Sequence, residues 1–483
     1  MQHASLFLAI LTTSLVAAAC GDDETGAGGA TTTSSGAGSP ATTTSAQVTS
    51  GNASANASAS TGMSVIDSCD DADPVGPPCV EVPATGPYGT RSFSVPAAAH
   101  WVNTGLFVDA GTEVQITATG TWTGGGTYAA GESGPEGHAG QLQRGCNVGS
   151  LTARIGLGYD DADIECVGEG TTMIASKAGI LYLGAIIDTD LGDTYGVRLP
   201  NEGALAVTVT SDGATVPTVF ADDAATFDFS SIASGWVELR AEHVTITAPA
   251  AIAQQDRATI APALAFFDAV YEKQAELRGA TPYQGERVRF YPDASIDGIG
   301  YMLAGNPVRM MPVIFENPAP GERLLASNDP AHGVWGFAHE LGHVFSFVNG
   351  TWHYQQDTLE AWCNLFTVYA LRGLMRPDPG FGNDATYPSA TFCPDKATYL
   401  ASGTYDAQFK GDPFLQLCFL LTFEEAYGFS MYSEVFATLN AIPWQEIPSS
   451  PPAAVWGWVR DEMSSAAGED VTPIFQEWKI PLP

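Results

Sequence analysis

Two histidines four residues apart carry the clearest chemical signal in this chain, because residues 339–343 read His-Glu-Leu-Gly-His. On an α-helix His339 and His343 lie on one face, so both imidazoles can reach a single zinc ion. Glu340 is adjacent to His339, where its carboxylate can take a proton from a water on that ion. The pattern predicts a hydrolytic zinc centre with Glu340 as its general base. The alternative is a pair of core histidines that share a helix face.

A catalytic zinc takes a third protein ligand and keeps one position open. The metzincin pattern needs Gly at position 346 and His at position 349, and Ser346 and Asn349 exclude it. The gluzincin pattern takes the third ligand from a following helix, and Glu360 is there, with sixteen residues between it and His343. Asn364 lies one helical turn further on the same face, so we expect it to orient the Glu360 carboxylate.

Other interpretations of these residues remain open at the level of sequence. Asp357 and Glu360 fit a D-x-x-E helix cap, in which Glu360 only satisfies a backbone N–H group. Rival third ligands are His353, Asp357, Glu424 and Glu425. Three observations favour the metal centre. The chain has only eight histidines, it is predicted to be exported, and the small Gly342 lets a neighbouring element approach closely.

Helical periodicity dominates the chain from about residue 216 to its end, and short strands such as residues 287–292 precede the helices. Helices are predicted at residues 260–279, 333–350, 359–374, 413–428 and 431–442. Asp329-Pro330 gives a start signal for the helix that carries the two histidines, and Asn349-Gly350 gives a stop signal. These features predict an α+β domain over residues 216–483.

A different pattern fills residues 67–215, where apolar residues alternate with polar ones. Residues 106–122 and 203–213 show this two-residue period between Gly and Asp. The pattern predicts an all-β sandwich ahead of the α+β domain.

The N-terminus resembles an export signal. Residues 6–19 form an apolar run, too short to span a bilayer, that ends in small residues before Cys20. This resembles a bacterial lipoprotein signal over residues 1–20, with Cys20 lipidated; cleavage after Ala19 is the alternative. Residues 21–66, nearly all Gly, Ala, Ser and Thr, predict a disordered tether. We expect an exported protein, either a cell-surface or outer-membrane lipoprotein or a secreted one, that meets a membrane only through its lipid.

The net charge argues against one class of partner, and the cysteines suggest disulfide pairs. The chain has 54 Asp and Glu against 19 Lys and Arg, a net charge of -35, which argues against nucleic-acid binding. Export permits disulfides. Cys69 with Cys79, and Cys146 with Cys166, are plausible local pairs. Cys363, Cys393 and Cys418 leave one odd thiol that the sequence does not identify.

With these residues in place, the second half of the chain resembles the enhancin-like, mucin-targeting zinc metallopeptidases, a gluzincin family. The similar blocks are residues 286–311, 335–345, 360–370, 426–436 and 466–483. The resemblance implies that His339, His343 and Glu360 bind Zn²⁺ and that Glu340 is the general base. Where the family often has M-H-x-G-Y-P, this chain has Leu303 and Asn306 in place of the His and the Tyr.

Residues 100–122 and 179–196 resemble PA-IL-like bacterial lectin modules. The resemblance implies a Ca²⁺ site that holds galactose-type glycans, with Asp188 and Asp193 as ligands. The alternative is that these two residues are ordinary turn carboxylates.

Together these expectations describe an all-β sandwich followed by an α+β gluzincin metallopeptidase domain with an HExxH helix. The first hypothesis is a zinc endopeptidase that cleaves glycosylated proteins held by the β module. The second is a non-enzymatic carbohydrate-binding surface protein. The third is a gluzincin that acts on unglycosylated proteins.

Overall fold

The structure of the protein is a computed structural model. It describes residues 64–66, 81–83, 87–97, 99, 101–124, 131–159, 164–185, 202–316, 323–326, 334–348, 351–378, 381 and 384–483. Asp188 and Asp193 lie outside these ranges, and so do Cys20 and the predicted pair Cys69 and Cys79. In the described part of the chain, no helix has the length and apolar character needed to cross a bilayer.

Residues 87–215 are here called the β-region. All of the helices and strands that the structure describes in this region are strands. Nine of them form one antiparallel sheet: β3 (Pro87–Pro96), β4 (Val102–Val108), β5 (Glu113–Gly124), β6 (Gly131–Ser133), β9 (Leu151–Ile155), β10 (Glu165–Cys166), β11 (Gly170–Ile174), β12 (Gly179–Ala185) and β13 (Glu202–Thr215). The long β13 joins them, because it pairs with β3, β5 and β4. The pairings of β13 therefore connect all nine strands into one hydrogen-bonded sheet, and the predicted sandwich stays a prediction.

Alternation explains why these residues become strands. Along β5, Val114, Ile116 and Ala118 are buried and the residues between them are exposed. The buried set packs with Leu205, Val207 and other apolar residues into a core of the β-region. Two short pairs accompany the sheet: β1 (Ser64–Ile66) with β2 (Glu81–Pro83), and β7 (Leu142–Gln143) with β8 (Cys146–Asn147).

Residues 216–483, here called the α/β region, begin with a six-stranded sheet in the order β14-β15-β16-β17-β19-β18. Its strands are β14 (Thr218–Phe220), β15 (Trp236–Arg240), β16 (Val244–Pro249), β17 (Val288–Pro292), β18 (Met302–Leu303) and β19 (Val308–Met310). The sheet is mixed, and β18 forms its edge, antiparallel to β19. The predicted strand at residues 287–292 corresponds to β17.

The helices of the α/β region follow the predicted periodicity. They are α3 (Ala250–Gln255), α4 (Arg257–Arg278), α5 (Val313–Glu316), α6 (Trp335–Ser346), α7 (Leu359–Gly373), α8 (Ser389–Phe392), α9 (Lys396–Ser402), α10 (Pro413–Tyr427), α11 (Phe429–Ala441), α12 (Pro452–Ala467) and α13 (Thr472–Glu477). All five predicted helices are confirmed. Helix α4 ends as expected at Gly279, whose left-handed φ of 66° suits glycine.

The sheet of the α/β region has two unlike faces. One face is apolar and packs against the helices in the main core: Val237, Leu239, Val244, Ile246, Val288, Phe290, Val308 and Met310. The other face carries Trp236, Glu238, Arg240, Thr245, Thr247, Arg289, Tyr291 and Arg309. A separate cluster made of Trp101, Leu157, Ile180, Tyr182 and Val216 packs against Trp236 and Tyr291 of this second face. The β-region therefore covers the polar face of the sheet.

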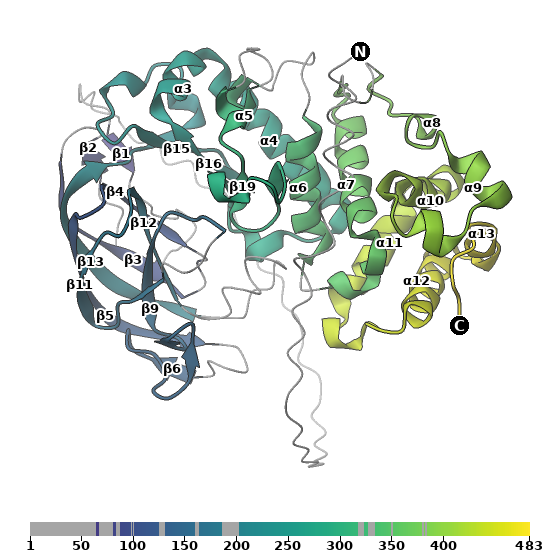
Figure 1. The fold of residues 1–483 in the computed structure, drawn as a ribbon, viewed down its shortest axis with the longest axis horizontal. Helices are drawn as coiled ribbons and strands as arrows, with labels where there is room; N and C mark the ends of the chain where they lie inside the picture. The colour runs from purple at the N-terminus through teal and green to yellow at the C-terminus, as the bar shows by residue number, and fades with distance from the viewer. Residues whose placement is uncertain are drawn as a thin grey trace, which may run out of the picture.

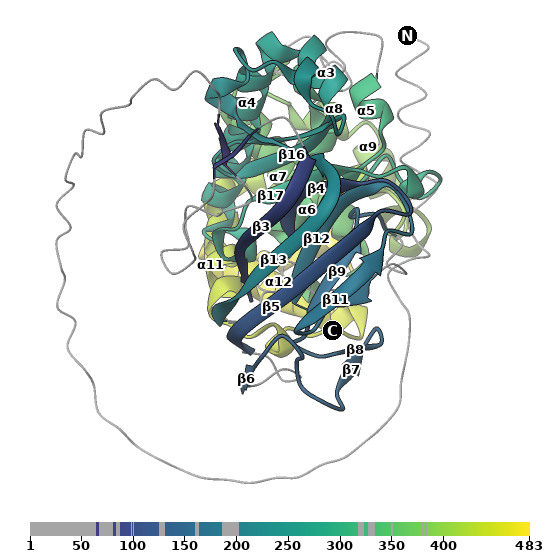
Figure 2. The ribbon, with the colours of Figure 1, turned by 90° about the vertical axis from the view of Figure 1, so that its left-hand side faces the viewer.

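The figures show the same arrangement. In Figure 1 the β-region lies to the left of the sheet, and the helices α6 to α13 lie to its right. In Figure 2, turned by 90°, the strands of the β-region lie in front of β16 and β17. The sheet of the α/β region is thus enclosed between the β-region and the helices.

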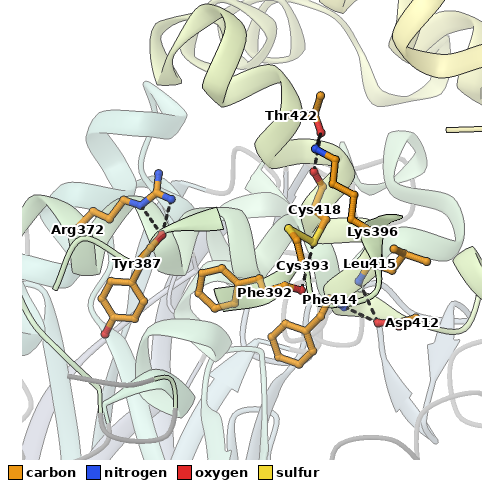
Figure 3. The surroundings of a disulfide bond; sticks show 10 residues. All are labelled: Arg372, Tyr387, Phe392, Cys393, Lys396, Asp412, Phe414, Leu415, Cys418 and Thr422. Atoms are coloured by element: carbon orange, nitrogen blue, oxygen red, sulfur yellow. Dashed lines mark hydrogen bonds between the residues drawn. A yellow bond between two sulfur atoms is a disulfide. The ribbon is translucent and has the colours of Figure 1, made fainter. Parts of the chain in front are cut away.

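Two disulfides are present among the described cysteines. Cys146 pairs with Cys166, which confirms the predicted local pair. Cys393 pairs with Cys418, which ties the segment after α8 to α10 (Figure 3). The odd thiol is Cys363, and it is buried in α7.

Candidate metal centre

Helices α6 and α7 pack side by side and carry the residues singled out in the sequence. They approach closely at Gly342, where an added Cβ atom would lie 2.5 Å from the backbone oxygen of Cys363. The prediction that Gly342 allows a close neighbour is confirmed. Helix α4 also packs against α6, since Gln274 donates to the Ala338 carbonyl at 2.7 Å and Arg278 to the Phe345 carbonyl at 3.1 Å.

We expect Gly342→Ala to destabilise the fold by about 1–3 kcal/mol, because the new methyl group collides with backbone that cannot move aside easily. Thermal unfolding measures this change. Gly336→Ala in the same helix is the matched control, because its Cβ would lie 3.4 Å from the flexible side chain of Met302. Equal midpoints for the two variants would contradict the close contact.

The ligand atoms of His339, His343 and Glu360 converge. The Glu360 carboxylate lies 3.1 Å from His339 Nε2 through one oxygen and 3.5 Å from His343 Nε2 through the other. Two ligands of one tetrahedral zinc ion lie about 3.3 Å apart, given bonds of about 2.0–2.2 Å to each. The donor set therefore fits zinc.

Asn364 fixes the orientation of His339. Its Oδ1 atom lies 2.8 Å from His339 Nδ1. An amide oxygen can only accept, so Nδ1 carries the proton and the lone pair of Nε2 faces the Glu360 side. We expected Asn364 to orient Glu360, and that prediction is wrong. Asn364 follows Glu360 by one turn, but the crossing of α6 and α7 brings the His339 ring to it.

The site is buried on the histidine side and open on the Glu360 side. The side chains of His339 and His343 are 8% and 7% exposed, and that of Glu360 is 26% exposed. Burial alone would lower the pKa of His343, but Cys363 and Glu360 outweigh it and raise this pKa to about 10. Burial would raise the pKa of Glu360, but the facing histidines hold it well below its usual range.

Glu340 lies beside this cluster, with its Oε1 atom 4.0 Å from His339 Nε2. Burial raises the pKa of its carboxyl group above the usual value. Such a carboxylate next to a metal position is suited to moving a proton.

The alternatives for Glu360 are not observed. Helix α7 begins at Leu359, and its N-cap residue Thr358 makes no capping hydrogen bond with its side chain. Asp357 pairs instead with Lys410, at 3.1 Å. Among the rival ligands, His353 packs edge-on against Trp444, and Glu424 pairs with Arg372 at 3.0 Å. Neither belongs to the ligand cluster of the described residues.

Cys363 is the part of the site that the sequence did not reveal. The sequence marked it only as one of three cysteines that leave an odd thiol, and it lies within the ligand cluster. Its Sγ atom lies 3.4 Å from His339 Nδ1 and 3.7 Å from His339 Nε2, and it donates to the Glu360 carbonyl at 3.0 Å. Because Sγ is nearer to the nitrogen that bonds Asn364, it lies beside the ring and not in front of Nε2. Its spacing of three residues from Glu360 was the available signal.

We therefore expect Cys363→Ser to bind zinc with unchanged stoichiometry, because the sulfur packs against His339 without facing the ion. Metal analysis measures this directly. Cobalt(II) in place of zinc gives a second reading, since a thiolate ligand adds a strong near-ultraviolet band. Such a band in the wild-type protein, lost in Cys363→Ser, would contradict the expectation.

Several known proteins are similar to this chain. TRPM8 channel-associated factor 2 of Bos taurus is 27% identical over 250 residues, which is 51% of this chain and 25% of that protein. The TRPM8 channel-associated factor homolog of Danio rerio is 23% identical over 395 residues, which is 79% of this chain and 38% of that protein. The chain thus spans well under half the length of these curated relatives.

Solved structures share the fold at low sequence identity. A conserved protein of unknown function from Bacillus anthracis str. Ames aligns with a TM-score of 0.55 and 16% identity, over 82% of this chain and 76% of that chain. The ZmpB metallopeptidase from Clostridium perfringens aligns with a TM-score of 0.51 and 12% identity, over 79% of this chain and 73% of that chain.

The family comparison agrees with these matches and with the site. Residues 227–479, more than half of the chain, match the family described as Peptidase M60, enhancin and enhancin-like. The matched range contains His339, Glu340, His343 and Glu360. This chain belongs to the Peptidase M60, enhancin and enhancin-like family.

Proposed function

We propose that this protein is a zinc-dependent endopeptidase that hydrolyses peptide bonds in glycosylated proteins. The observation that carries the proposal is the convergence of His339, His343 and Glu360 at the spacing of zinc ligands, with Glu340 buried beside them. Two imidazoles and one carboxylate supply three protein ligands, which is the number found in catalytic zinc sites.

Each residue has a defined task in this proposal. Zinc, when bound, polarises the scissile carbonyl and makes water a stronger acid. Asn364 keeps the proton of His339 on Nδ1, so that Nε2 is free to bind. Glu340 accepts the proton of the attacking water and then donates it to the leaving amine.

Export and a lipid anchor at Cys20 are part of the proposal. Support comes from the apolar run at residues 6–19 and from the disulfides Cys146–Cys166 and Cys393–Cys418, because disulfides persist in oxidising compartments. Glycoproteins are proposed as substrates because residues 335–345 and 360–370 resemble those of mucin-targeting enzymes. A Ca²⁺-dependent glycan site at Asp188 and Asp193 stays a prediction.

Digestion of one mucin-type glycoprotein, with and without its glycans, tests the proposal. The protein is assayed as isolated, after removal of metal by a chelator, and after zinc is restored. We expect cleavage of the glycosylated form only, loss with the chelator and recovery with zinc. Equal cleavage of both forms would overturn the glycoprotein assignment and favour general proteolysis. No cleavage of either form by the zinc-loaded protein would overturn the peptidase assignment.

A further inference from the structure

The start of α6, the helix that carries both histidines of the metal centre, is held by a carboxylate from another part of the chain. Asp378, which follows α7, is 2% exposed and accepts from the N–H groups of Val334 and Trp335 at 2.7 and 2.9 Å. The N-cap residue Val334 has no side chain that could do this. The first N–H groups of a helix carry a partial positive charge, so a buried carboxylate is stabilised there. Asp378 thus takes the place of a local cap.

The end of α6 is held by a guanidinium group. Arg278, the last residue of α4, is fully buried and donates to the carbonyls of Phe345 and Val348 at 3.1 and 3.0 Å. It also donates to the Phe436 carbonyl of α11 at 3.0 Å and to the Thr351 hydroxyl at 2.8 Å. Burial lowers the pKa of Arg278 to about 10, so the group stays charged at neutral pH. A positive charge is stabilised at this end of a helix, where the carbonyls carry a partial negative charge.

The segment between α6 and α7 is fastened at the same place. Tyr354 and Gln355 both donate to the Ser346 carbonyl at 3.1 Å, and Gln355 also donates to the Tyr354 hydroxyl at 2.9 Å. All three residues are buried. These bonds tie the last residue of α6 to the segment that leads into α7, the helix of Glu360.

The two histidines lie between the two held ends. His339 follows Trp335 by one helical turn, and His343 precedes Phe345 by two residues. A helix of twelve residues is marginal by itself, so the form and place of α6 depend on contacts with the rest of the fold. If either end loosens, both imidazoles lose their place opposite Glu360.

We propose that Asp378 and Arg278 are positioning residues for the metal centre, which hold α6 at its opposite ends so that both histidines face Glu360. The consequence for metal binding rests on the proposed function, whereas the restraint on α6 does not. Asp378 lies outside the ligand cluster, so it acts through the helix and not on the ion. A variant that keeps α6 in place in about a tenth of its molecules would bind zinc about tenfold more weakly.

Hydrogen exchange of the full chain without metal tests the restraint directly. Asp378→Ala is expected to speed exchange of the amides at the start of α6 by at least about tenfold, because this end opens more often. Asp378→Asn keeps an oxygen as acceptor and removes the charge, so we expect it to restore part of the protection. Arg278→Lys keeps the charge but lacks the planar fork of donors, and we expect faster exchange at the end of α6.

Zinc titration tests the consequence for the metal centre. We expect Asp378→Ala to raise the zinc dissociation constant by about tenfold and Asp378→Asn to raise it by less. Asp256→Ala is the matched control, because the buried Asp256 carboxylate pairs with Arg323 beside the start of α4 and not with α6. It is expected to lower the melting temperature as well, but to leave exchange in α6 and the zinc dissociation constant unchanged.

The outcomes separate the positioning role from general stability and from the proposed function. Wild-type exchange in α6 of both Asp378→Ala and Arg278→Lys would overturn the restraint. Faster exchange with unchanged zinc affinity would overturn the positioning role, and so would an equal loss of affinity in Asp256→Ala. A wild-type protein that binds no zinc would overturn the proposed function, and exchange alone would then decide the restraint. If Asp378→Ala fails to fold, Asp378→Asn carries the same comparison with smaller expected changes.

Discussion

Glu340→Gln is expected to lower peptide hydrolysis by about 10²–10⁴-fold, the usual contribution of a general base, while zinc remains bound. Glutamine has nearly the shape and volume of glutamate, so we expect the local structure to be kept. It cannot accept a proton from water. Since His339, His343 and Glu360 are untouched, the ligand set remains complete. The loss is expected in kcat, measured on the zinc-loaded protein.

Glu425→Gln is the matched control, because this exposed carboxylate of α10 was a rival candidate in the sequence and lies outside the ligand cluster. We expect wild-type hydrolysis from it. A Glu340→Gln protein that hydrolyses peptides at the wild-type rate would show that another group takes the proton. Loss of zinc in the same variant would show that Glu340 has a structural role at the metal.

The sequence predicted that His339, His343 and Glu360 come together, because the signals for this cluster are local. On a helix, two histidines four residues apart lie on the same face. The helices α6 and α7 were both predicted from their apolar periodicity. The small residue at 342 pointed to a close neighbour, which is the backbone of Cys363. These inferences needed only the geometry of one helix at a time.

The features of the site that the sequence did not predict depend on how α6 and α7 cross. Asn364 and Glu360 share a face of α7, so the sequence paired them, but the His339 ring of α6 lies within reach of Asn364. Cys363 entered the site for the same reason. The start of α6 is also held from afar, since Asp378 accepts from the N–H groups of Val334 and Trp335 at 2.7 and 2.9 Å. No local pattern indicates a partner more than forty residues away.

The contact between the β-region and the sheet of the α/β region could not be predicted, because polar and apolar residues simply alternate along its strands. In β15 and β17, polar residues at every second position suggest a solvent-facing side of a sheet. Glu238 is fully buried instead, under the cover of the β-region, where Asn103 and Arg289 both donate to its Oε2 atom. Charge composition alone could not show that this face is covered.

Glu360→Ala is expected to remove the metal. Zinc would lose one of its three protein ligands, and we expect the affinity to fall by at least about 100-fold. After dialysis, the zinc content is expected to drop from one ion per chain to near zero. Zinc stabilises a protein that binds it only when folded, by about 2.7 kcal/mol at a concentration 100 times its dissociation constant. The rise in melting temperature on adding zinc should therefore vanish in Glu360→Ala.

Asp357→Ala provides the control that makes this result specific. Asp357 lies three residues before Glu360, was a rival ligand in the sequence, and pairs with Lys410 on the surface. An exposed ion pair contributes about 0–1 kcal/mol, so its loss should leave zinc binding and the zinc-induced stabilisation intact. Full zinc content in Glu360→Ala would mean that Cys363 or a residue outside the described chain completes the site. In that case the arrangement of His339, His343 and Glu360 would be an ion pair between α6 and α7, and the proposed hydrolytic function would lose its basis.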